Sequence, residues 1–140
     1  MFSPGTKVKG VPFIGKKLNI FSDKMIKNYD FTIEKTFFRD TIPCYKFSCL
    51  KKPNIPSSKV TITRLITFYD RRTMNIIART YALKDVTPMF SFDMSMFIEL
   101  KYDFDEYLPV TIKYNGQWNV PIKKGERIKF RMNCSKYEQV

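Results

Sequence analysis

The sequence predicts an all-β fold, mainly an antiparallel sandwich or barrel, with at most one or two short helices. Apolar and polar residues alternate along several segments, which is the period-two pattern of half-buried strands. Turn formers separate these segments, and few of them show the 3.6-residue repeat of a long amphipathic helix. Short strands joined by turns must close or stack to bury their apolar faces, hence the sandwich or barrel.

Residues 1–27 are predicted to form a basic N-terminal arm or edge segment. The segment holds six lysines against one acid, Asp23, and prolines and glycines interrupt it. The apolar residues 11–14 between the lysines either dock on the core, insert at a membrane interface or contact a neighbouring subunit. Residues 23–28 are the best candidate for a short helix, with Ser22 as its cap.

Residues 28–140 are predicted to form a single β-rich domain. Alternation favours a first strand over residues 29–34, and a second strand is expected over residues 43–50. Residues 51–58 contain two prolines and several turn formers, which indicates a surface loop within the domain.

A β-hairpin is expected next, because residues 60–69 and 75–83 are rich in β-branched and aromatic residues and residues 70–73 are polar. The clearest strand follows over residues 90–101. Its apolar residues occupy every second position, namely Phe90, Phe92, Met94, Met96, Ile98 and Leu100.

The pair Asn115-Gly116 is a strong turn signal for a further hairpin. A three-residue loop over residues 114–116 would place Ile112 opposite Trp118, whereas a two-residue loop would place it opposite a polar residue, so we predict the longer loop. Residues 123–126 are expected to turn into a last strand over residues 127–132. Its inward row would be Ile128, Phe130 and Met132, and its outward row Arg127, Lys129 and Arg131.

The composition argues against catalysis. The chain has no histidine, which removes the commonest general base, the Ser–His and Cys–His pairs, and the usual nitrogen ligand of zinc. Its three cysteines, Cys44, Cys49 and Cys134, are too few for a four-thiolate site and are expected to be reduced. No phosphate-binding loop is present. We therefore predict no enzyme activity, no catalytic residue, no metal, no cofactor and no small-molecule substrate.

The net charge of +12 favours a polyanionic partner, either nucleic acid, with RNA preferred over DNA, or an anionic membrane surface. No RNP-type, helix-turn-helix or zinc-finger spacing is visible, so contacts are expected to go to the phosphate backbone. The candidate contacts are the lysines of the N-terminal segment and the cations near the C-terminus: Lys7, Lys9, Lys16, Lys17, Lys24, Lys27, Lys123, Lys124, Arg127, Lys129 and Arg131.

A cluster of carboxylates, Asp103, Asp105 and Glu106, follows the clearest strand. We expect either a solvated loop or a contact for the basic arm of a neighbouring copy, which would favour a head-to-tail homo-oligomer. Acid–base chemistry or a divalent cation is the alternative role for this cluster. Phe13 and Ile14 are the apolar candidates for the same subunit contact.

These features lead to the hypothesis of a non-enzymatic structural protein of the viral matrix or capsid type. The first alternative is a module with an OB-like barrel that binds single-stranded nucleic acid through Arg127, Lys129 and Arg131. The second is a virus-encoded protein-interaction protein or host antagonist that pairs through a strand edge. Without an apolar signal or membrane-spanning segment, we expect an intracellular location, cytoplasmic or nuclear, or a virion, and neither secretion nor a transmembrane anchor.

Overall fold

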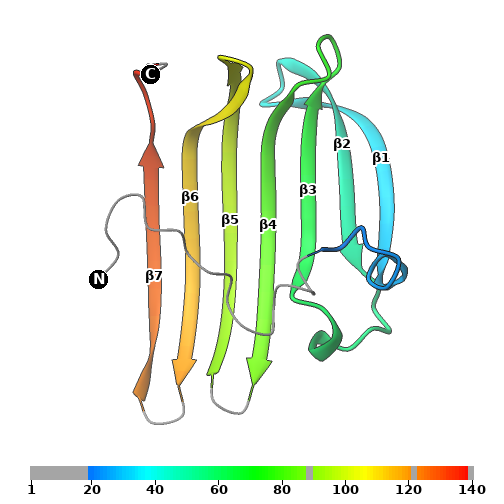
Figure 1. The fold of residues 1–140 in the computed structure, drawn as a ribbon, viewed down its shortest axis with the longest axis vertical. Coiled ribbons are helices and arrows are strands. Elements are labelled where there is room, and N and C mark those ends of the chain that lie inside the picture. Colours follow the sequence, from blue (N-terminus) through cyan, green and yellow to red (C-terminus); the bar gives the residue numbers. More distant parts are fainter. Residues whose placement is uncertain (1–18, 88–89, 121–122, 139–140) are drawn as a thin grey trace.

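The computed structural model describes residues 19–87, 90–120 and 123–138. Within these ranges, seven strands form one antiparallel sheet in which each strand pairs with its neighbours in the sequence (Figure 1). The all-β class is therefore confirmed. The strands are β1 (Tyr29–Phe38), β2 (Ile42–Lys51), β3 (Ile62–Asp70), β4 (Ile76–Thr87), β5 (Phe90–Asp103), β6 (Glu106–Val120) and β7 (Lys123–Asn133), and the 3-10 helices are η1 (Ile26–Asn28) and η2 (Ser57–Lys59).

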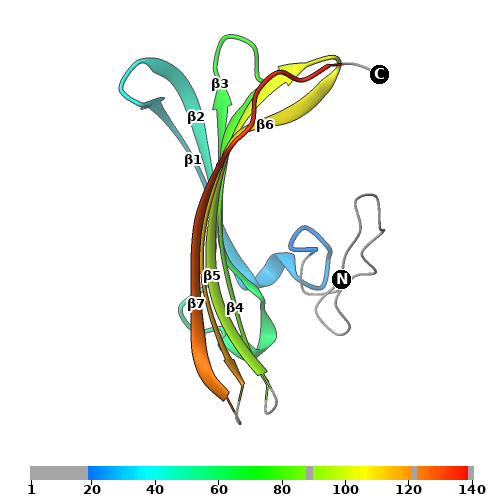
Figure 2. The same cartoon turned by 90° about the vertical axis from the view of Figure 1, so that its left-hand side faces the viewer.

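The arrangement of the strands differs from the sandwich or barrel that we expected. The described strands lie in one open, curved sheet with β1 and β7 at its two edges (Figure 2). Alternation determines which side chains share a face, but it is the same in one curved sheet and in two stacked ones. The sequence pattern therefore could not decide whether the sheet closes.

The register divides the side chains between two faces, because residues paired across a ladder point to the same side. One face, here called the apolar face, carries Phe31, Ile33, Phe47, Leu65, Tyr81, Met96, Tyr114 and Phe130. The opposite or polar face carries Asp30, Glu34, Lys46, Arg64, Thr80, Ser95, Asn115 and Lys129.

The main core lies on the apolar face of β1 to β4. Residues 19–28 cross this face, where Ile20 and Met25 are buried against Cys49 and Leu65 (Figure 2). The buried hydroxyl of Tyr29 donates a hydrogen bond to the carbonyl oxygen of Ile62 at 2.7 Å. This part of the predicted N-terminal segment therefore packs on the sheet.

The expected short helix is present only as the single turn η1. The N-cap residue of η1 is Met25 and not Ser22, and no side chain caps it. In the turn before η1, the backbone N–H of Met25 donates to the Ser22 hydroxyl oxygen at 3.3 Å. A second, smaller core lies on the polar face, where Phe38, Cys44 and Ala78 are buried.

The strands predicted over residues 29–34, 43–50 and 90–101, and the hairpin over 60–69 and 75–83, are confirmed. The prediction of a turn at residues 114–116 was wrong.

Strand β6 runs straight through Asn115-Gly116. The turn before β6 instead uses Phe104 and Asp105, both with positive φ, of 52° and 60°. A built Cβ on Gly116 would lie 2.3 Å from the Tyr114 hydroxyl oxygen, so glycine here makes room for a neighbouring ring instead of making a turn.

The predicted turn at residues 123–126 was also wrong, because these residues begin β7. Lys123 already pairs with Val120 of β6. The expected inward row of this strand is on the apolar face but is not buried: Ile128, Phe130 and Met132 are 46%, 46% and 49% exposed. Among the described residues, no further layer covers the apolar face of β7.

Candidate functional site

A cluster of cations on the polar face, here called the basic patch, consists of Lys113, Arg127, Lys129 and Arg131. Strand β7 supplies three of them at alternate positions, which lie about 6.8 Å apart along a strand. The register places Lys113 directly beside Arg131. The three β7 side chains are exposed, as is Lys113. The patch is thus a row of positive charge along one edge of the sheet.

Within the described part of the chain, the contacts of these cations are with neutral groups. Arg127 donates from Nη2 to Oε1 of Gln117 at 3.2 Å, and Arg131 donates from Nε to Oδ1 of Asn133 at 3.3 Å. The Lys113 ammonium lies 5.6 Å from the centroid of the Phe97 ring. These contacts orient the side chains without neutralising them, so their charge is available to an anion.

A polar hollow of about 330 Å³ adjoins the basic patch. It extends over β3 to β7, so it lies across the middle of the polar face. Its lining includes two arginines, one carboxylate and several neutral polar groups: Arg64, Asp93, Ser95, Asn115, Gln117 and Arg127. Donors and acceptors are therefore both present beside the row of cations.

A second hollow, of about 430 Å³, lies on the apolar face. It is lined by Ile33, Tyr45, Phe47, Tyr69 and Met74. Met74 comes from the turn between β3 and β4, where it has a φ of 60°. Alternation in β1 predicted the face on which Ile33 lies, but no sequence pattern indicated the hollow.

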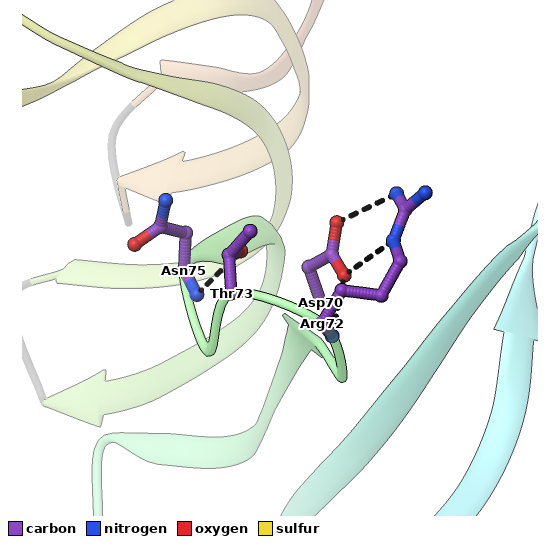
Figure 3. A network of polar contacts seen from close by, with 4 residues as sticks. All are labelled: Asp70, Arg72, Thr73 and Asn75. Carbon is purple, nitrogen blue, oxygen red and sulfur yellow. Dashed lines mark hydrogen bonds and ion pairs between the residues drawn. The ribbon is translucent and has the colours of Figure 1, made fainter.

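The turn that positions Met74 is held by a polar network (Figure 3). The carboxylate of Asp70 accepts hydrogen bonds from the backbone N–H of Arg72 at 2.8 Å and from its guanidinium at 2.9 and 3.0 Å. The hydrogen bonds from Arg72 lower the pKa of Asp70. In the same turn, Asn75 N–H donates to the Thr73 hydroxyl oxygen at 3.2 Å. The network fixes this turn without any glycine.

The structure places the acidic cluster at the turn between β5 and β6. Asp103 accepts a hydrogen bond from the N–H of Phe104 at 3.0 Å and lies 3.6 Å from the Lys101 ammonium. All three carboxylates are exposed. In Figure 1 the turn lies at the top of the sheet, whereas residues 19–28 lie about halfway down, near β1.

The predicted polyanion contacts are only partly brought together. Arg127, Lys129 and Arg131 share the polar face, whereas Lys24 and Lys27 belong to the segment that covers the apolar face. The backbone of Lys123 and Lys124 begins β7. Lys7, Lys9, Lys16 and Lys17 lie outside the described residues, as do Phe13 and Ile14.

Sequence analysis missed Lys113 and Arg64 as members of this surface. The predicted turn at residues 114–116 would end the strand that contains Lys113. The pairing of Lys113 with Arg131 could therefore not be predicted. Read as one continuous strand, β6 places Lys113, Asn115 and Gln117 on a single polar face by alternation alone. The signal was present, but the turn prediction concealed it.

Two of the three thiols are buried. Cys44 and Cys49 are 0% exposed, and burial raises the pKa of both. A raised pKa keeps a thiol protonated and weakens it as a nucleophile or metal ligand. Among the described residues, no three Cys, Asp or Glu side chains are grouped so that they could hold a metal ion.

None of the helices in the described part of the chain has the length and apolar character needed to cross a membrane. Comparisons with protein-family models, with curated proteins and with solved structures found no match for this chain. The chemistry of the surfaces described above is therefore the basis for assigning a function.

Proposed function

We propose that this protein is a non-enzymatic structural subunit, of the kind that viruses use as matrix or capsid proteins, that self-associates and binds single-stranded RNA. The observation that carries the RNA-binding part is the basic patch. Its four cations lie on one exposed face, and their contacts with Gln117, Asn133 and Phe97 leave the positive charge unneutralised.

The geometry supports binding to the RNA backbone. Cations at every second position of a strand form a straight row that can follow a chain of phosphates. The partly buried ring of Phe97 packs beside Phe38 and lies beneath the Lys113 ammonium, so it supports this cation from the core side. Neutral amides beside the row, from Asn115 and Gln117, can bind sugar or base edges without adding charge.

The strand arrangement disfavours the OB-like alternative. An OB fold is a five-stranded Greek-key barrel, whereas the described strands form an open sheet in simple sequential order. The placement of the charges also disfavours a membrane surface as the partner of the basic patch. Arg127, Lys129 and Arg131 point away from the apolar face, so they would face water if that face met a bilayer.

A salt series with fluorescent single-stranded RNA tests this proposal. Replacing Arg127, Lys129 and Arg131 by Ala removes three phosphate contacts. The slope of log affinity against log salt should fall by about 2, because each contact with a single strand contributes about 0.7. The melting temperature should hardly change, since the three side chains are exposed.

The matched control replaces Lys24, Lys27 and Lys59 by Ala. This variant loses the same charge from exposed positions away from the basic patch, and its salt slope should stay close to that of the wild type. A larger loss in the control than in the β7 variant would contradict the proposal and move the site to the N-terminal segment. Equal affinity of wild type and β7 variant at every salt concentration would also contradict it, as would binding only to phosphatidylserine vesicles.

A further inference from the structure

The two edges of the sheet have backbones that pair with no further strand in the described part of the chain. Strand β1 is bonded only to β2, and β7 only to β6. Such edges present rows of N–H and C=O groups that favour pairing with another strand. Proteins that stay monomeric usually shield such edges, and both edges here are long, β1 with 10 residues and β7 with 11.

Both edges also expose apolar side chains on the same face of the sheet. On β1, Ile33 is 69% and Phe31 36% exposed, and on β7 Ile128 and Phe130 are each 46% exposed. Most apolar side chains between these edges are at least partly buried. Exposed apolar side chains thus lie at both margins, where a strand added in the plane of the sheet would cover them, and others lie near the β5–β6 turn and in residues 19–28.

The polar sides of the two edges carry opposite charges. Strand β1 presents Asp30 and Glu34, and β7 presents Arg127, Lys129 and Arg131. The spacing of the two acids along β1 equals the spacing of the two arginines along β7. Glu34 forms an ion pair with Lys46 at 2.9 Å, yet its side chain remains 58% exposed. Each edge is therefore mainly apolar on one side, with Lys35 on β1 and Glu126 on β7 as the charged exceptions, and on the other side the acids of β1 complement the cations of β7.

Strand direction limits how two copies can meet while keeping these faces continuous. Strands alternate in direction across the sheet, so β1 and β7 run the same way. A neighbouring copy in the same orientation places its β1 parallel to β7. A two-fold axis normal to the sheet would instead pair β7 with β7 or β1 with β1, which brings like charges side by side.

We propose that copies of this chain assemble edge to edge, with β7 of one copy pairing in parallel with β1 of the next. The apolar margins then meet on one face, and Asp30 and Glu34 meet the cations of β7 on the other. Only registers that differ by an even number of residues preserve this match. The interface is head-to-tail, so it generates a ring if the rotation between copies closes and a filament if it does not.

This inference concerns the self-association in the proposed function and does not depend on RNA binding. The test therefore uses nucleic-acid-free full-length protein, whose mass is followed by sedimentation over a range of concentrations. The wild type should grow beyond a dimer as concentration rises. The association of D30K/E34K should be weaker by a factor of about ten or more, because two attractive pairs become repulsive. R127E/K129E/R131E should weaken in the same way.

Two further variants make the test specific. Combining D30K/E34K with R127E/K129E/R131E exchanges the charges of the two edges, so association should return. D103K/D105K changes the net charge by the same amount as D30K/E34K but at the turn between β5 and β6, and it should assemble like the wild type. Circular dichroism and melting curves establish that each variant is folded.

The outcomes separate this inference from RNA binding. D30K/E34K keeps the whole basic patch, so loss of assembly with salt-dependent RNA binding retained supports the edge pairing. A wild type that stays monomeric, or that stops at a dimer, overturns it. An exchanged-charge variant that is folded but does not associate overturns it as well, and so does a D103K/D105K variant that weakens as much as D30K/E34K.

Discussion

The half of the sheet formed by β1 to β4 differs from the half formed by β5 to β7 in what covers it. In the first half, residues 19–28 and the connection between β2 and β3 pack on the apolar face, and Val60, Thr61 and Thr67 are among the most buried side chains. In the second half, both faces of β7 are exposed over residues 125–133. One half thus carries most of the core, and the other presents surface.

Besides residues 19–28, the difference follows from the lengths of the connections. The chain between β2 and β3 spans residues 52–61 and includes η2, so it can fold back over the sheet. The chain between β5 and β6 consists of Phe104 and Asp105 only. A two-residue hairpin loop leaves no chain to cover a neighbouring face. The second half can therefore bury its apolar face only against a partner or a distant segment.

Thiol reactivity should show the largest difference between the halves. Cys44 and Cys49 lie in the first half at 0% exposure, and Cys134 follows β7 and is partly exposed. Buried thiols react only when the structure opens, so we expect Cys134 to be alkylated at least about a hundredfold faster than the other two. Mass spectrometry after timed iodoacetamide labelling measures this. Equal rates would mean that the first half opens as readily as the second.

Core truncation should give the next largest effect. Leu65 is buried in the main core, and Leu65→Ala should lower the free energy of unfolding by about 3 kcal/mol through lost burial and the cavity left behind. Phe130→Ala removes a larger side chain from the exposed half and should cost less than about 1 kcal/mol. Urea denaturation in dilute solution compares the two variants. A larger loss for Phe130→Ala would show that the apolar face of β7 is buried in solution.

The hydroxyl of Tyr29 gives a pH-dependent test of the covered half. Burial, with a smaller contribution from Cys49, raises the pKa of Tyr29 from 10 to about 12. The folded state therefore favours the neutral phenol, and this contribution to stability is complete below pH 10 and is lost as the pH rises through about 12.

In Tyr29→Phe this contribution is absent, so its melting temperature should fall less steeply above pH 10 than that of the wild type. At neutral pH the variant should be destabilised by about 1 kcal/mol, because the carbonyl oxygen of Ile62 loses a buried hydrogen bond. If the melting temperatures of the two proteins fell equally steeply above pH 10, the phenol would be accessible to water in the folded state.

The smallest effect should come from the ion pair that links the two halves. Arg39, in the turn after β1, is bonded to Glu99 of β5. The Arg39 side chain is 57% exposed, so Arg39→Ala should destabilise the fold by about 0.5 kcal/mol, and less at high salt. Urea denaturation at two salt concentrations checks this. A loss above about 2 kcal/mol would mean that the two halves depend on this contact to stay joined.

Local sequence predicted most strands correctly and failed at the turns of the second half. Asn115-Gly116 has the strongest local preference for a turn, yet β6 continues through it, while Phe104-Asp105 turns with positive φ at both residues. A positive φ costs a bulky residue roughly 1 kcal/mol or more. Pairing of a long β6 with both β5 and β7 outweighs that cost, and such pairing cannot be read from a dipeptide.

The sequence alone determined the all-β class, the alternation of β1 and β5 and the row of cations on β7, because each depends on local order along one strand. Only the tertiary structure decided that the strands form one open sheet, that Lys113 joins the basic patch and that oppositely charged edges lie at its two margins. These features depend on register and closure, which are set by contacts between residues far apart in the chain.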